Sequence, residues 1–505
     1  MSSPNPQILH RDTTAPAEFQ SAVWGRVFNK RRDLSRVPLT FVKARTTGDI
    51  ISAVKLAEAN SARVSVRSGG HSWAGWSVRS DAVLVDLGDL DLSDEDGEGK
   101  TGEKPAWAVD GGRGGGRGRI EYDGRSKVVS CPASTTGRML NGYLKERGRM
   151  FAGGHCPDVG LGGFLLQGGM GWNCKNWGWA CESVVGIDVV TADGEERHAS
   201  SVENLDLFWA AKGAGPGFPA IVTRWYLLTR PLLEMYQSVY VFPISEYRKV
   251  LQWVVDVSPT ADPETEIVSV SSYLPGDDEL TILANFTCFK SSKSEAEKAL
   301  APIHASRPSG AKIEVFCDRT SLAKEYGTQA SANPEGHRYC AENAYVSNDE
   351  DVVAVLEKSF TTIPSKKSFA IYFAMNPTSR RPLPDHDTQA GMALSMQSDH
   401  YFALYSCWET EAEDEKCVGW VKEVMAEVER HSDGAYLGDS DFQQRRTKFW
   451  SDEAGKRLME VRRKWDPKGR ICGYLDAGDR SGVEGLKNEF EWKFESDIET
   501  LKLDD

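Results

Sequence analysis

Hydrophobic and polar positions near the start of the chain change from a strand period to a helix period and back. Residues 40–44 predict a short strand, and the apolar positions after Asp49 (50, 53, 54 and 57) recur at the helical spacing, with Asp49 as the predicted cap. Residues 64–66 alternate as a second strand, and residues 82–85 form the continuous apolar run typical of a buried strand. The pattern predicts a strand–helix–strand unit with a glycine turn after its second strand.

A glycine- and arginine-rich stretch interrupts this pattern. Residues 92–123 are first acidic and then contain GGRGGGRGR at Gly111 to Arg119. RNA-binding arms have this composition, but strand-like sequence on both sides favours a long hairpin insertion. The elements predicted beyond it are strands at 127–131, 183–190 and 220–228, helices at 136–144 and 205–212, and a tight hairpin turn at 191–194.

The second half of the chain has longer alternating strands and amphipathic helices. This alternation, from residue 234 to about residue 430, predicts an antiparallel sheet covered by helices on one face. The predicted strands are 236–242, 266–273, 280–289, 369–374 and 401–408, and the predicted helices are 247–257, 295–304, 352–360 and 412–429. No catalytic motif occurs in this region. The sequence after Gly485 predicts a C-terminal helix on the surface.

Length and charge narrow the functional classes. A chain of 505 residues is too long for one compact core, so two or three domains are expected. The formal net charge of −14 argues against nucleic acid and against a membrane surface as partners. The absence of a spanning apolar run and of an N-terminal signal segment predicts a cytoplasmic protein. The ten cysteines are then expected to be reduced, and those near His155 (Cys156, Cys174 and Cys181) match no standard metal-site spacing, so no metal is expected.

Two glycine-dense stretches are the candidates for function. The first glycine stretch, Val64 to Trp73, reads VSVRSGGHSW: a strand, an arginine, a glycine turn where backbone N–H groups can approach an anion, and a histidine. The second glycine stretch, Gly153 to Trp172, reads GGHCPDVGLGGFLLQGGMGW and has eight glycines in twenty residues, too many for a stable helix. We expect it to be a loop or ribbon pressed against a flat or bulky ligand.

Four motifs occur in an order that resembles the FAD-linked oxidases of the vanillyl-alcohol oxidase/p-cresol methylhydroxylase superfamily. They are RSGGHSW, the second glycine stretch, the DVVTADGE hairpin and NLDLFWAAKGAGPGF. The run from Tyr436 to Tyr474, with KWDPKGR inside it, is similar to the closing segment of the berberine bridge enzyme branch. The resemblance implies an α+β fold, with an FAD-binding domain of two α/β subdomains and a substrate domain whose antiparallel sheet is covered by helices. The implied units are an N-terminal segment (1–36), the FAD-binding domain (37–233), the substrate-binding domain (234–433), a C-terminal segment that returns to the FAD domain (434–480) and a C-terminal helix (481–505).

The resemblance also implies roles for individual residues. His71 matches the histidine that is bonded to the flavin 8α-methyl carbon. Cys156 matches the cysteine bonded to flavin C6 in doubly attached members, the alternative being a buried free cysteine in a singly attached enzyme. Val159 falls where a small residue borders the oxygen-reactive face of the flavin, which favours an oxidase over a dehydrogenase. The remaining residues implied to bind FAD are Arg67, Ser68, Gly69, Gly70, Ser72, Trp73, Gly154, Gly160, Gly162, Gly163, Gly168, Gly169, Gly171, Val189 and Tyr474.

The implied activity is that of an FAD-dependent oxidase. A small organic substrate, such as an alcohol, phenol, sugar or amine-bearing secondary metabolite, would give a hydride to covalently bound flavin, and dioxygen would reoxidise the flavin to yield hydrogen peroxide. Tyr436 matches the tyrosine of the family's Tyr-x-Asn pattern and is the candidate base, or else a structural tyrosine, because Gly438 replaces the asparagine. The alternative function is a flavin-bound but non-redox cyclase or isomerase. The expected partners are the small-molecule substrate and dioxygen, for a monomer or a simple homo-oligomer.

Overall fold

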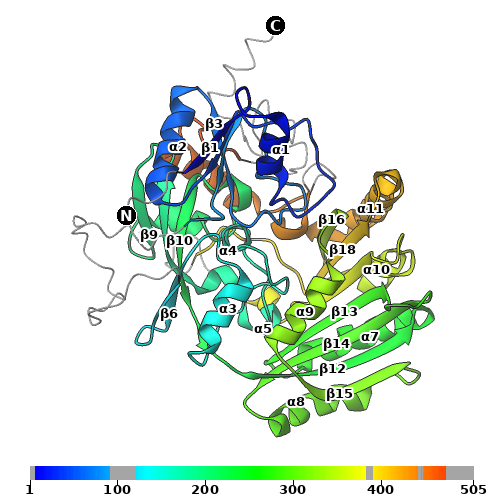
Figure 1. The fold of residues 1–505 in the computed structure, drawn as a ribbon. Coiled ribbons are helices and arrows are strands. Elements are labelled where there is room, and N and C mark those ends of the chain that lie inside the picture. The colour runs from blue at the N-terminus through cyan, green and yellow to red at the C-terminus, as the bar shows by residue number, and fades with distance from the viewer. Residues whose placement is uncertain (1–5, 91–119, 383–390, 442–444, 446, 474–505) are drawn as a thin grey trace.

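The computed structural model describes residues 6–90, 120–382, 391–441, 445 and 447–473. Two smaller sheets and one large sheet organise the chain (Figure 1). The predicted GGRGGGRGR hairpin, Tyr474 and the predicted C-terminal helix lie outside the described residues. None of the helices in the described ranges combines the length and the apolar character that crossing a bilayer requires.

The first sheet has four strands in the order β1-β2-β4-β3: β1 (Gln7–His10), β2 (Thr40–Lys43), β4 (Ala82–Asp86) and β3 (Arg63–Arg67). Strands β2 and β3 both run parallel to β4, as expected for a strand–helix–strand unit. The helices of this part are α1 (Pro16–Trp24) and α2 (Thr47–Ala59). The predicted cap of α2 needs correction: Thr46 is the N-cap, and Asp49 completes a capping box by accepting the backbone N–H of Thr46.

The second sheet is antiparallel and has the order β5-β6-β10-β8-β9. Its strands are β5 (Glu121–Asp123), β6 (Val128–Pro132), β10 (Ala220–Leu228), β8 (Val184–Thr191) and β9 (Glu196–Ser200). Its helices are α3 (Gly137–Lys145), α4 (Leu161–Leu166), α5 (Cys174–Trp177) and α6 (Leu205–Ala210), and a short ladder joins β7 (Arg149–Met150) to β11 (Arg230–Pro231). Helix α4 corrects the expectation of a purely irregular second glycine stretch, because burial of Leu161, Phe164 and Leu165 outweighs the low helix propensity of its glycines.

The third sheet has eight antiparallel strands in the order β15-β12-β14-β13-β17-β18-β16-β19. They are β15 (Ile313–Thr320), β12 (Glu234–Pro243), β14 (Leu280–Lys290), β13 (Thr265–Tyr273), β17 (Phe369–Ala374), β18 (His400–Trp408), β16 (Arg338–Val346) and β19 (Ser432–Gly434). The helices of this region are α7 (Tyr247–Val257), α8 (Lys293–Ser306), α9 (Leu322–Ala332), α10 (Val352–Thr361) and α11 (Asp414–Val428). The predicted antiparallel sheet with a helical cover is confirmed, but β15, α9, β16 and β19 were not predicted.

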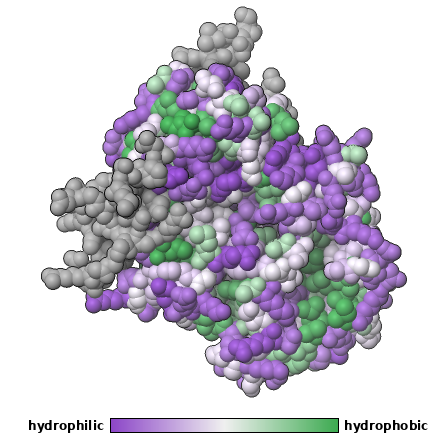
Figure 2. Space-filling view, viewed as in Figure 1, coloured by the Kyte–Doolittle hydropathy of each residue, from purple (hydrophilic) through white to green (hydrophobic). Residues whose placement is uncertain are grey.

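The two faces of the eight-stranded sheet have different neighbours because side chains alternate along each strand. On β17, Ala370 and Tyr372 belong to the apolar core beneath α7, α8, α10 and α11. The intervening Phe369, Ile371 and Phe373 point to the opposite face, where they line a cavity. In Figure 2 apolar surface is visible on the part of the molecule where Figure 1 draws this sheet.

The last described part of the chain returns to the first sheet. Helix α12 (Asp452–Trp465) contacts α6, and Ile471 forms a parallel bridge with Val64 on β3. Between them, Asp466 accepts the backbone N–H groups of Arg470 and Ile471, each at 2.7 Å. This arrangement brings Val64 and Ile471, far apart in sequence, side by side.

Candidate active site

A cavity of about 370 Å³ lies where the first glycine stretch, the second glycine stretch and the free face of the large sheet meet. Its walls include residues 65–73 in the last part of β3 and the turn after it, most of residues 154–167 around α4, and the β17 and β18 side chains Phe369, Ile371, Phe373 and Tyr405. Tyr436, Gly438 and Asp439 complete it from the loop after β19. The size and the apolar wall with a few polar groups are typical of small-molecule sites.

The two glycine stretches touch each other through their backbones. A Cβ atom on Gly69 would lie 2.5 Å from the backbone nitrogen of Gly160, and one on Gly160 would lie 2.7 Å from that of Gly69. A Cβ on Gly162 would meet the Ser68 hydroxyl at 2.7 Å. Gly163, in contrast, has open space at its Cβ position. Several of these glycines are therefore needed for contact between the two stretches, a role distinct from approach to a ligand.

The Arg67 guanidinium is committed to the protein. It contacts Asp86 at 2.5 Å and donates to the carbonyl of Ala22 at 2.9 Å and to that of Val23. Both side chains of the Arg67–Asp86 pair are fully buried. Arg67 thus anchors the end of β3, where it also lines the cavity.

His71 presents a buried nitrogen without a partner. Its ring stacks on Phe28 with a centroid distance of 4.9 Å, and its Nδ1 atom has no hydrogen bond within the described residues. Burial lowers the pKa of His71, so the imidazole is neutral at pH 7. A neutral imidazole with an unpaired buried nitrogen at a cavity wall suits the attachment role that the resemblance implied.

Cys156 also lines the cavity, at the start of the second glycine stretch. Burial, reinforced by Asp439 and Asp158, raises the pKa of the Cys156 thiol to about 12. The thiol is therefore protonated at neutral pH in this structure, and its conversion to a nucleophilic thiolate requires a change in its surroundings.

Asp439 brings a carboxylate to the cavity wall. It accepts hydrogen bonds from the Tyr401 hydroxyl at 2.6 Å and from the Trp73 indole nitrogen at 3.2 Å. Trp73 packs on Tyr405 at a centroid distance of 5.5 Å, so an aromatic chain joins the first glycine stretch to β18. Burial raises the pKa of Asp439, while these donors oppose the shift.

Tyr436 is held by its backbone and its hydroxyl. The Asn343 side chain on β16 makes two hydrogen bonds to the Tyr436 backbone, both at 2.7 Å, and the Tyr436 hydroxyl accepts the Met170 N–H at 3.2 Å. Burial, with a contribution from Asp439, raises the pKa of Tyr436. A base would need a lowered pKa, so the phenol of Tyr436 is a neutral hydrogen-bonding group in this structure.

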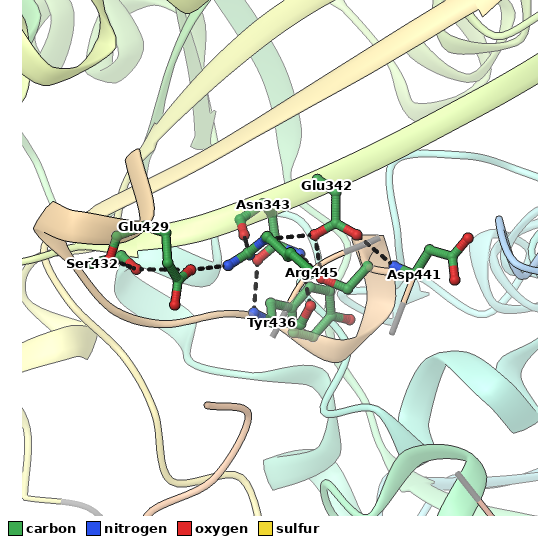
Figure 3. A network of polar contacts seen from close by, with 8 residues as sticks. Glu342, Asn343, Glu429, Ser432, Tyr436, Asp441 and Arg445 are labelled. Atoms are coloured by element: carbon green, nitrogen blue, oxygen red, sulfur yellow. Dashed lines mark hydrogen bonds and ion pairs between the residues drawn. The ribbon is translucent and has the colours of Figure 1, made fainter. Parts of the chain in front are cut away.

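A network of polar contacts surrounds Asn343 (Figure 3). Arg445 donates to Glu342 at 2.9 Å and also to Glu429 and to the Asn343 carbonyl. Glu342 is 1% exposed and accepts the Asp441 N–H at 2.8 Å. Burial raises the pKa of Glu342 to about 7 even though Arg445 is beside it.

Most of the residues singled out in the sequence meet at the cavity, and some do not. Gly168 and Gly169 are outside its lining and have positive φ angles of 106° and 77°, which glycine tolerates. Gly171 packs on the Ala152 carbonyl, and Val189 is buried within β8. The sequence missed His155, Glu266 and Asp439 as functional candidates, because their partners come from distant elements and no local motif marks them.

The observed groups fit an FAD cofactor. The unpartnered Nδ1 of His71 and the buried, unpartnered Ser65 hydroxyl both lie at the cavity wall. The open Cβ position of Gly163 leaves backbone accessible there. His71 and Cys156 line the same cavity from different stretches, as a group bound between them requires.

Comparisons with known proteins agree with this site. An FAD binding domain family model matches residues 38–103 and 98–200. The FAD-linked oxidoreductase ptmO of Penicillium ochrochloron is 37% identical over 453 residues, which cover 89% of this chain and 93% of ptmO. The solved structure of Physcomitrella patens BBE-like 1 has a TM-score of 0.73 at 16% identity, over 93% of this chain and 96% of that one. That of a carbohydrate oxidase from Microdochium nivale, in complex with a substrate analogue, has a TM-score of 0.72 at 22% identity, over 93% and 96%.

The chain belongs to the FAD-linked oxidoreductases of the vanillyl-alcohol oxidase/p-cresol methylhydroxylase superfamily, and it shares the fold of the berberine bridge enzyme-like protein BBE-like 1. It is an FAD-dependent oxidoreductase, and the expected α+β fold with a PCMH-type FAD-binding part is confirmed.

Proposed function

We propose that this protein is an oxidase that removes two electrons from a bulky, largely apolar alcohol or phenol and passes them to dioxygen. The observation that carries the proposal is the cavity, which joins the FAD-type glycine stretches to an apolar sheet face. When bound, FAD supplies the hydride acceptor and the route to dioxygen, with hydrogen peroxide as the reduced product. The position of Val159 in the cavity wall fits access of dioxygen to that group.

The cofactor is proposed to be attached at two points, through His71 and Cys156. The orphaned Nδ1 of His71 supports the first bond. The position of Cys156 on the same cavity supports the second, although its raised thiol pKa means that attachment needs prior deprotonation. Gly69 and Gly160 hold the two stretches, and hence the two attachment points, in contact.

The wall opposite the glycine stretches favours an apolar substrate. Phe369 stacks on Tyr405 with a centroid distance of 4.7 Å, and Ile371 and Phe373 continue the same face. A sugar would require many polar groups to replace the water around its hydroxyls. Here the polar side chains near that wall are few, and Asp439 is already engaged by Tyr401 and Trp73. Tyr436 is proposed to donate its hydroxyl hydrogen to a substrate oxygen.

The experiment is a peroxide-release screen on the purified holoenzyme with aryl alcohols, phenols, aliphatic alcohols, sugars and amines. Hits are then mixed with the enzyme without oxygen while the flavin absorbance is followed. We expect aryl alcohols or phenols to bleach the flavin and to release peroxide in air. Product formation while the flavin stays oxidised would instead support a cyclase or isomerase. Bleaching by sugars alone would contradict the apolar substrate class.

A further inference from the structure

His155 and Glu266 form a histidine–carboxylate pair at the cavity wall. His155 directly precedes Cys156, lines the cavity and has a side chain that is 14% exposed. Its Nε2 atom lies 3.0 and 3.1 Å from the two carboxylate oxygens of Glu266 on β13. The ring packs on Trp172 and on Phe373, with centroid distances of 4.3 and 5.4 Å. The imidazole is therefore fixed in place next to the apolar wall.

The contacts of Glu266 determine where the imidazole hydrogen resides. Glu266 is 4% exposed, and one of its oxygens also accepts the Asn173 N–H at 2.6 Å. Because a carboxylate only accepts, the Nε2 atom of His155 carries the hydrogen. In neutral His155 the lone pair is then on Nδ1, and no described residue hydrogen-bonds to that atom.

We propose that His155, oriented by Glu266, is the base that takes the hydroxyl proton of the substrate, a role that rests on the oxidase function proposed above. His155 is the catalytic residue of the pair and Glu266 is its positioning residue. The arrangement is the general one of a base whose second nitrogen is bound by a third group. Tyr436, which has a raised phenol pKa, is left with the hydrogen-bonding role.

The protons and electrons of the proposed reaction are all accounted for by His155, FAD and dioxygen. Oxidation of an alcohol to a carbonyl breaks one O–H bond and one C–H bond and forms the second C–O bond. The hydroxyl hydrogen leaves as a proton to Nδ1 of His155, and the carbon hydrogen leaves with its electron pair to the FAD acceptor. Dioxygen finally takes both electrons and two protons as hydrogen peroxide. The positive charge formed on His155 is stabilised by Glu266 at 3.0 Å.

The groups that face His155 come from three directions. Glu266 lies on β13, Asp439 also lines the cavity and interacts electrostatically with His155, and Cys156 is the next residue in the chain. The remaining packed rings, Trp172 and Phe373, are neutral. A pH profile must therefore be compared among variants of the pair itself, so that the contribution of Asp439 is common to all.

The first test measures anaerobic flavin reduction by stopped flow, with cinnamyl alcohol as the probe, across about pH 5 to 9. We expect H155Q to slow reduction by about 100-fold or more, and to abolish the fall in rate on the acid side. E266Q should slow reduction by about tenfold while keeping KM within about twofold, because it loosens the base without removing it. Flavin content and the visible spectrum should match the wild type in both variants.

The matched control is H198Q. His198 on β9 also has a carboxylate partner, with its Nδ1 atom 2.7 Å from Asp188, but it is outside the cavity lining. H198Q should reduce the flavin at the wild-type rate. Equal rates and equal pH profiles for H155Q and the wild type would overturn the proposed role of His155.

A second measurement determines, without turnover, which nitrogen of His155 carries the hydrogen. The holoenzyme is labelled with ¹⁵N-histidine and its NMR spectrum is recorded. Of the signals from the nine histidines, those that disappear in H155Q belong to His155. We expect the Nε2–H form with an unprotonated Nδ1 at about pH 8, and a change of that form in E266Q. An Nδ1–H form, or an imidazolium throughout about pH 6 to 8, would overturn the inference. A wild-type flavin that no alcohol reduces would contradict the oxidase function separately.

Discussion

The two sides of the cavity are built on different principles. On the side of the glycine stretches the contacts are mainly between backbones, with Gly69 and Gly160 in direct contact. On the sheet side the contacts are between side chains: Glu266 on β13 binds His155 of the second glycine stretch, and Tyr401 on β18 binds Asp439. In the proposed function, the first side holds the cofactor, and at Gly69 and Gly160 it leaves no room for an added Cβ atom. In the proposed function, the second side selects the substrate and takes its proton.

The largest expected effect is at the contact between the glycine stretches. G69A would place a Cβ atom 2.5 Å from the Gly160 backbone nitrogen, and neither backbone can move without displacing its stretch. We expect a loss of about 3 kcal/mol or more in the free energy of unfolding, together with loss of bound flavin. Urea unfolding and flavin absorbance measure the two effects. G142A on helix α3 is the control, because its Cβ position is open and the change should stabilise by about 0.5–1 kcal/mol.

The network of polar contacts around Asn343 predicts a pH-dependent stability, because it contains the buried carboxyl group of Glu342. Burial raises the folded-state pKa of Glu342 from its ordinary 4.5 to about 7, so the folded protein holds a proton that the unfolded chain releases. The stability contributed by protonated Glu342 is therefore present below about pH 4.5 and is lost as pH rises to about 7. Between about pH 5 and 7, the free energy of unfolding of the wild type should fall by up to a few kcal/mol relative to that of E342Q. A constant difference between their urea midpoints would contradict this.

The apolar wall should control substrate affinity. F369A removes the ring that stacks on Tyr405 at 4.7 Å. For an aryl alcohol identified in the screen, we expect KM to rise by about tenfold with little change in kcat, because the ring binds substrate and transition state alike. Steady-state peroxide release measures both constants. F369L, which keeps an apolar side chain, should recover most of the affinity, and a similar loss in both variants would indicate a change of fold.

The smallest expected effect is at Tyr436. Y436F removes a hydroxyl whose described protein partner is the Met170 N–H at 3.2 Å. We expect a cost of about 1 kcal/mol in stability, a decrease of kcat below about tenfold, and an unchanged acid limb in the pH profile of kcat/KM. Loss of that limb in Y436F but not in H155Q would assign the base to Tyr436.

The difference between the two sides of the cavity also explains which features could be predicted from the sequence. Strands β2, β4, β10 and β17 followed from their apolar patterns, and the glycine stretches followed from composition, because these are local properties. The sheet side depends on pairs such as His155 with Glu266, which are 111 residues apart. At Arg67, likewise, the local pattern could not show that Asp86 and two distant carbonyls bind the guanidinium.

The two-point attachment of FAD is tested most directly by the mass of the purified, acid-denatured protein, followed by peptide mapping. If the cavity holds FAD between the two glycine stretches, the denatured chain should carry one flavin mass. The flavin should then be found bonded to both the peptide that contains His71 and the peptide that contains Cys156. H71A and C156A alone should each retain flavin through the other residue. An unmodified chain, with all of the flavin released into the supernatant, would contradict the two-point attachment.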